Sequence, residues 1–120
     1  MYRPDPIKKV RSAMLADPDN WEIPFFNFVD DFRYSKDLSI IAGPLDQDHP
    51  RFDALLASTI EYLCDERGLE TPDWVWETPS LKDPWFVSGI ENLKAMAIVE
   101  SPVFFRRRNI FVLENFLSRV

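Results

Sequence analysis

Three consecutive arginines, Arg106, Arg107 and Arg108, form the run of positive charge that could do chemistry in this otherwise acidic sequence. Guanidinium groups bind phosphates and carboxylates through paired hydrogen bonds. Successive residues of a helix point about 100° apart, so three adjacent arginines on a helix would not converge on one ligand. Two interpretations stay open: the arginines bind a phosphate or a partner, or they pair internally with acids such as Glu100 and Glu114.

The aromatic segment 74–86 is the second candidate, because it contains Trp74, Trp76 and Trp85 between several prolines. Indole rings are common at recognition surfaces and could line a groove for a peptide or a small ligand. Each ring also buries a large area, which favours the alternative that these residues fill the side of a small core. The three tryptophans and the three arginines are the candidate partner-binding residues.

Motifs for catalysis and for metal binding are missing from the sequence. The single histidine, His49, and the single cysteine, Cys64, are too few to hold zinc. Cys64 falls near the C-terminal end of a predicted helix, where the dipole disfavours a thiolate. Neither a glycine-rich nucleotide loop nor a G-x-S-x-G turn occurs. We expect no enzyme, no cofactor and no metal, with a small enzyme that uses His49 and carboxylates as an open alternative.

Composition predicts the class of protein. The chain has 120 residues, of which 46% are hydrophobic, and a formal net charge of -6. We expect a single compact domain over residues 1–120. The acidic balance disfavours broad attachment to nucleic acid or anionic lipid, so any nucleic-acid contact would be local. No segment approaches the ~20 apolar residues of a membrane span, and one cysteine fits a reducing compartment. We expect a cytoplasmic protein.

Hydrophobic spacing predicts a mostly α fold of five or six helices, several of them short. The clearest helix covers residues 50–67, beginning at Pro50 after the polar His49 and ending at Gly68. Further helices are predicted from after Pro6 to near residues 17–18 and over residues 24–32, 90–100 and 103–107, with a last turn over 114–120. The core residues that this pattern predicts are Phe28, Phe32, Leu55, Leu56, Ile60, Leu63, Leu93, Met96, Phe111 and Leu117.

Two segments are less regular. Residues 34–47 predict a loop in which 38–42 is extended, and residues 71–87 predict short helical turns between prolines. Residues 110–112 are β-prone, but a strand without a partner is not stable. We therefore expect one small β pairing between residues 110–112 and 38–41.

Four stretches resemble a pattern of small uncharacterised bacterial proteins, frequent in actinobacteria, that end in an FRRRNIFV-like segment. The stretches are residues 83–86, 93–97, 101–112 and 117–120, and the likeness covers the chain from about residue 52 onward. Such proteins occur alone, beside genes for nucleotidyltransferase-like toxins, or as tails of helix-turn-helix regulators. The resemblance implies an accessory or antitoxin-like role with another protein, such as that toxin or regulator, as partner. It transfers no catalytic residue.

The first 31 residues depart from a helix-turn-helix, because Pro18 and Pro24 interrupt the span that would hold the turn and the recognition helix. We therefore predict a non-enzymatic binding module that acts through protein–protein contact, with a homodimer left open. Nucleic-acid or phosphate binding by Arg106, Arg107 and Arg108 is the first alternative function.

Overall fold

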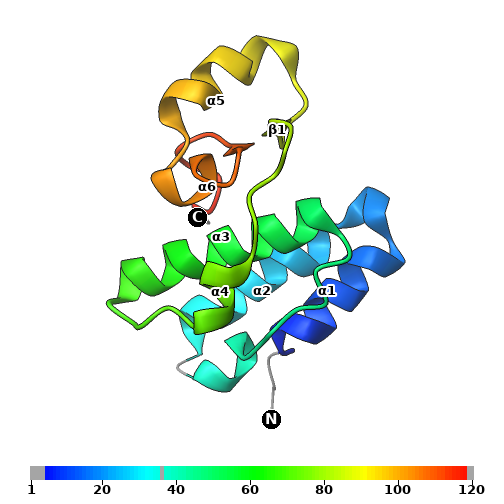
Figure 1. The fold of residues 1–120 in the computed structure, drawn as a ribbon, viewed down its shortest axis with the longest axis vertical. Helices are drawn as coiled ribbons and strands as arrows, with labels where there is room; N and C mark the ends of the chain where they lie inside the picture. The colour runs from blue at the N-terminus through cyan, green and yellow to red at the C-terminus, as the bar shows by residue number, and fades with distance from the viewer. Residues whose placement is uncertain (1–4, 36, 119–120) are drawn as a thin grey trace. The chain divides into compact units, whose positions relative to one another are not determined.

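The computed structural model describes residues 5–35 and 37–118. Within these residues the chain forms six α-helices, three short 3-10 helices and one sheet of two parallel strands (Figure 1). The predicted mostly α class with one small β pairing is therefore confirmed. The chain divides between Leu45 and Asp46 into two compact units. That residues 1–120 behave as one domain stays a prediction.

The first unit contains a pair of packed helices, α1 (Ile7–Ala16) and α2 (Glu22–Tyr34). A 3-10 turn, η1 (Pro18–Asn20), connects them, since proline is accommodated in the first turn of a helix. Helix α2 begins at Glu22, two residues before the predicted start at Pro24. The predicted apolar stripe of α2 is buried at all four positions, which are Phe25, Phe28, Val29 and Phe32.

The segment after α2 is helical and not extended, so the expectation for residues 38–42 was wrong. Leu38–Ile41 forms a 3-10 helix, η2, that buries Ile40 and Ile41 at consecutive positions. A strand would send these two side chains to opposite faces. The hydroxyl and the backbone N–H of Ser39 both donate to the Asp37 carboxylate, at 2.6 and 2.9 Å, and these bonds lower the pKa of Asp37.

The second unit is built on α3 (Pro50–Arg67), whose bounds match the prediction. His49 Nδ1 accepts from the backbone N–H of Phe52 at 3.2 Å, and the Asp53 carboxylate accepts from the N–H of His49 at 3.0 Å. These reciprocal bonds satisfy two amides at the start of the helix. Gly68 ends the helix with φ +66°, in the left-handed region that glycine adopts without a steric penalty.

Helix α3 is buried on most of its circumference, not on one stripe alone. Every residue from 52 to 61 is buried, and the polar members are Asp53, Ser58, Thr59 and Glu61. Within the second unit, α4 (Asp73–Glu77) and α6 (Val103–Arg106) pack against it. Polar side chains that the sequence pattern assigns to solvent therefore need partners inside the protein.

Strand β2 (Ile110–Phe111) pairs in parallel with β1 (Trp85–Phe86), so the predicted pairing with residues 38–41 was wrong. The register places Trp85 opposite Ile110 and Phe86 opposite Phe111. The Phe86 and Phe111 rings stack with centroids 5.1 Å apart. Helical turns were expected at residues 85–86, but these residues form a strand. The backbone N–H of Trp85 donates to the carbonyl of Asn109 at 2.9 Å.

Helix α5 (Lys94–Glu100) follows a 3-10 turn, η3 (Glu91–Leu93), and is joined to β2 by the buried Ser101. The Ser101 hydroxyl donates to the carbonyl of Ile110 at 3.1 Å and accepts from the N–H of Val112 at 3.3 Å. One hydroxyl thus serves as donor and acceptor where α5 ends.

The end of the chain and part of the core differ from expectation. Residues 114–117 form turns and no helix, while residues 119–120 of the predicted last helical turn lie outside the described residues. Seven of the ten predicted core residues are buried. The exceptions are Leu93 of η3 and Phe111 of β2, which are partly exposed, and Met96 of α5, which is exposed because that helix buries only Ala97.

Candidate functional site

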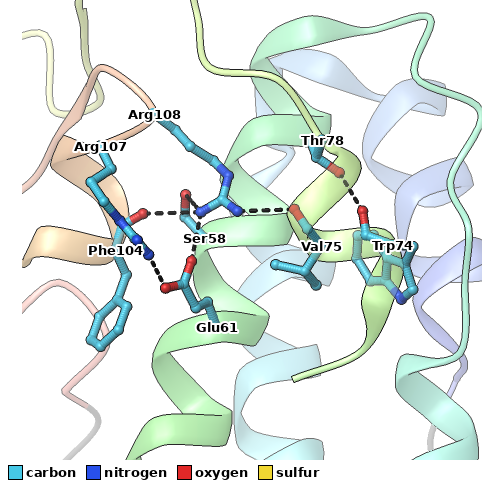
Figure 2. Close-up of polar contacts among 8 residues, drawn as sticks. All are labelled: Ser58, Glu61, Trp74, Val75, Thr78, Phe104, Arg107 and Arg108. Atoms are coloured by element: carbon cyan, nitrogen blue, oxygen red, sulfur yellow. Dashed lines mark hydrogen bonds and ion pairs between the residues drawn. The ribbon is translucent and has the colours of Figure 1, made fainter. Parts of the chain in front are cut away.

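The arginine cluster, Arg106, Arg107 and Arg108, lies at the end of α6, and its three side chains have different surroundings. Arg106 is exposed, the Arg107 side chain is 51% exposed and Arg108 is buried. Arg107 and Arg108 both pair with the buried carboxylate of Glu61 on α3, Arg108 through Nη1 to Oε1 at 2.8 Å (Figure 2). The two guanidinium groups therefore share one carboxylate, and the group of three side chains keeps a net positive charge.

The remaining contacts of Arg108 connect three helices. Nη2 donates to the carbonyl of Val75 on α4 at 2.9 Å, and Nη1 lies 3.3 Å from the Ser58 hydroxyl of α3. Nη1 is also 3.3 Å from the carbonyl of Phe104 on α6. Among the described residues, Arg108 Nε has no hydrogen-bond partner. Because this network holds α3, α4 and α6 together, Arg108 has a structural role inside the second unit.

Internal pairing was one of the two interpretations of the cluster, but the predicted acids were wrong. The sequence pointed to Glu100 and Glu114, whereas the structure uses Glu61, which is 46 positions before Arg107. Nearness along the sequence favoured the first two acids. The fold instead places the end of α6 against α3, so that a distant acid is the one within reach.

The three tryptophans are also distributed between interior and surface. Trp74 is buried, Trp85 is partly buried with the Arg51 guanidinium 5.3 Å from its ring centroid, and Trp76 is 56% exposed. Trp76 lines an open hollow of about 190 Å³ beside Arg107 and Arg108. Of the six candidate residues, Trp76, Arg106 and Arg107 are the ones exposed at the surface.

His49 and Cys64 occupy structural positions. His49 caps α3 through Nδ1, as a helix-start residue would, and its ring stacks on Phe52 at 4.1 Å. Cys64 is fully buried, and this burial raises the pKa of its thiol while the nearby Arg67 guanidinium opposes the shift. A protonated, buried thiol is a poor nucleophile. Within residues 5–35 and 37–118, no three His, Cys, Asp or Glu side chains are grouped as a metal site would need.

An apolar surface on α5 was missed by reasoning from the sequence. Only Ala97 of this helix is buried. Ala95, Ile98 and Val99 share the opposite side at i, i+3 and i+4, with Ile98 49% and Val99 79% exposed, and Met96 flanks them. We call these four residues the α5 apolar face. A surface helix normally presents polar residues to solvent.

A signal for this face does exist in the sequence. Residues 95–99 are apolar at five successive positions, and a helix with such a run cannot turn all of them toward one core. Ile90 and Val103, in the segments before and after α5, are also exposed. Met96, which was predicted to lie in the core, is one of these exposed residues. Periodicity alone does not tell which of five successive apolar positions face the interior.

A hollow of about 490 Å³ borders the α5 apolar face and is lined by two acids. Met96 and Glu100, one helical turn apart, line it together with Tyr62, Leu113 and Glu114, and its lining includes no Lys or Arg among the described residues. The backbone N–H of Glu114 donates to Glu100 Oε1 at 3.2 Å, which holds that carboxylate in place. We call this feature the acidic hollow. In the described part of the chain, neither Glu100 nor Glu114 forms an ion pair.

Comparisons with protein-family models, with curated proteins and with solved structures gave no match. No helix among the described residues combines the length and the apolar character that crossing a membrane requires. What the second unit offers to another molecule is an apolar helix face beside two carboxylates that have no cation partner among the described residues. Such an arrangement can bury apolar side chains and hold a positive charge next to them.

Proposed function

We propose that the protein is a non-enzymatic binding module of antitoxin-like or accessory type, which acts in the cytoplasm through protein–protein contact made by the α5 apolar face. The exposure of Ile98 and Val99 at the centre of this face carries the proposal. Contiguous apolar residues on the surface of a soluble protein commonly mark an interaction site. A partner that covers them removes apolar surface from water, which is the main driving force of association.

The magnitude fits a specific contact. Each Ile, Val or Met side chain that becomes fully buried contributes about 1.5–3 kcal/mol relative to its exposed state. Met96, Ile98 and Val99 are 48%, 49% and 79% exposed, so covering them would contribute only part of that amount for each side chain. Their sum would offset a part of the about 4–15 kcal/mol that association costs in lost freedom. Contacts around the face must supply the rest, as in interfaces that combine an apolar centre with a polar rim.

The partner that fits best is a basic protein. The net charge of -6 favours association with a positively charged surface and opposes association with a polyanion. Toxins that act on nucleic acid need such a surface to approach their substrate. The resemblance of the second half of the chain to small bacterial proteins encoded beside nucleotidyltransferase-like toxins supports the same kind of partner.

The structure offers less support to the alternative of nucleic-acid binding by the arginine cluster. Arg108 is buried, and both Arg107 and Arg108 pair with Glu61. A phosphate would have to compete with this carboxylate for Arg107, and Arg106 alone would supply little affinity. Replacing all three arginines at once would also remove the network that joins three helices, so loss of binding in that variant would have two explanations.

The test is co-purification of the tagged protein with the product of the neighbouring gene, followed by affinity measurement with Val99→Asp. Because an aspartate at the centre of the α5 apolar face must be desolvated on binding, we expect affinity to fall by at least about tenfold. Ile23→Asp is the matched control, since Ile23 is an exposed apolar residue on α2 in the first unit. It should bind as the unmodified protein does.

Circular dichroism should show that both variants keep their helical content, because both sites are exposed. Equal affinity for Val99→Asp and the unmodified protein would exclude the α5 apolar face as the contact surface. A strictly monomeric protein that binds no neighbouring product would contradict the proposed function as a whole.

A further inference from the structure

The acidic hollow differs from an ordinary solvated pair of acids in its position and in its lining. Glu100 is the last residue of α5, one turn after Met96, so the hollow opens at the flank of the α5 apolar face. Tyr62 and Leu113 add apolar surface to it, and Glu114 enters from the segment after β2. Two carboxylates and an apolar lining thus belong to one hollow that adjoins an exposed apolar helix face.

Three basic side chains of the second unit are engaged elsewhere. Arg107 and Arg108 pair with Glu61, and Lys94 pairs with Glu91 at 3.0 Å while it lies 5.4 Å from the Phe86 ring centroid. Glu100 and Glu114, the acids expected from the sequence to pair with the arginine cluster, form no ion pair with a Lys or Arg of residues 5–35 and 37–118.

Resting on the function proposed above, we propose that the acidic hollow binds one Lys or Arg side chain of the partner, within a segment whose neighbouring apolar residues cover the α5 apolar face. The two carboxylates would accept charge-assisted hydrogen bonds from the cationic group. The methylene stem of that side chain would pack on Met96, Leu113 and Tyr62, because Lys and Arg bury their stems against apolar surface. The docking segment is therefore basic and amphipathic.

The charge of the hollow argues for this occupant over others. A phosphate-bearing ligand would meet two carboxylates and no cation. A second copy of this chain carries the same net charge of -6, which opposes its approach to an acidic hollow. A basic protein segment satisfies the charge and the apolar face together. The apolar contacts would supply most of the affinity, and the hollow would supply selectivity and faster association.

The experiment selects ligands from a random dodecapeptide library displayed on phage, using the full chain as bait. Three bait proteins are compared: the unmodified chain, the double variant Glu100→Gln and Glu114→Gln, and Val99→Asp. Glu70→Gln with Glu77→Gln is the control of equal charge change, since both residues are exposed in the same unit. For the unmodified chain and this control we expect peptides that carry a Lys or Arg flanked by apolar residues.

For the Glu100→Gln and Glu114→Gln bait we expect the apolar residues to persist and the basic position to be lost. A selected peptide should bind this variant about tenfold more weakly than the unmodified chain. Replacing its basic residue by Met should weaken binding to the unmodified chain by a similar factor and leave binding to the double variant unchanged. Such coupling would locate the cation in the hollow.

Other outcomes separate the two proposals. Selection of apolar peptides that lack a basic residue, and whose binding is lost with Val99→Asp, would overturn the cation site and leave the proposed function standing. Absence of any peptide whose binding depends on Val99 would contradict the contact surface itself. A dimer in sedimentation analysis that dissociates in Val99→Asp would make a second copy the occupant and overturn the basic segment.

Discussion

At the scale of single residues, Glu61 is the one on which the polar interior of the second unit depends. It is buried on α3 and takes both Arg107 and Arg108 as partners. Burying a charge costs several kcal/mol, and a buried ion pair does little more than recover that cost. The ion pair therefore adds little net stability, but its loss would be costly, because the buried positive charge of Arg108 would have no negative partner.

Glu61→Gln should destabilise the protein strongly, because it leaves the buried Arg108 guanidinium without a negative partner. We expect the free energy of unfolding to fall by about 3 kcal/mol, measured by urea denaturation followed by circular dichroism. Glu70→Gln is the control, since Glu70 is exposed and its side chain has no hydrogen bond or ion pair among the described residues. It should change the stability by less than about 0.5 kcal/mol. Equal stabilities of the two variants would show that Glu61 does not neutralise Arg108.

At the scale of elements, α3 is defined by local chemistry at both of its ends. His49 and Asp53 exchange hydrogen bonds at the start, and Gly68 adopts a left-handed conformation at the end. Helix α5 shows the opposite situation. Its sequence is apolar around most of the helix, so local chemistry does not say which side faces the interior, and the packing of Ala97 decides it.

His49→Ala should shorten or fray the start of α3, because the backbone N–H of Phe52 loses its acceptor. A lost N-terminal cap typically costs about 1 kcal/mol of stability. His49→Asn should recover most of this loss, since asparagine is among the best residues at that position. Thermal unfolding of both variants tests the role; an equal loss in both would assign the contribution of His49 to its ring stacking on Phe52 instead.

At the scale of the whole molecule, the chain contains two units of unequal size that divide between Leu45 and Asp46. A segment of about 45 residues is close to the lower limit at which a hydrophobic core suffices without a disulfide or a metal. The sole cysteine, Cys64, lies in the second unit, so no disulfide can close within the first. Size alone therefore favours unfolding of the entire chain in one step, in line with the single domain that the sequence predicts.

We expect a single cooperative transition, tested with the variant Trp21→Phe. This substitution removes the one tryptophan of the first unit, so that fluorescence reports only on the second, which contains Trp74, Trp76 and Trp85. Far-ultraviolet circular dichroism reports on the helices of both units. The two probes should give the same midpoint. Two separated midpoints would make the units independent domains.

The sequence by itself determined the features that depend on neighbours along the chain. The bounds of α3 and the buried stripe of α2 follow from apolar spacing and from proline and glycine at helix ends. These signals act within one or two helical turns, where the backbone geometry is known in advance. The mostly α class follows from them, as do seven of the ten predicted core residues.

Only the tertiary structure decided the features that join distant segments. The sequence does not reveal that β2 pairs with β1, that Glu61 pairs with Arg107 and Arg108, or that Glu100 and Glu114 line one hollow beside an exposed α5 face. Any of the 20 acidic residues could have paired with the arginine cluster. Which one does so depends on where helices pack, because Coulomb and hydrogen-bond energies depend on distance in space and not on separation in sequence.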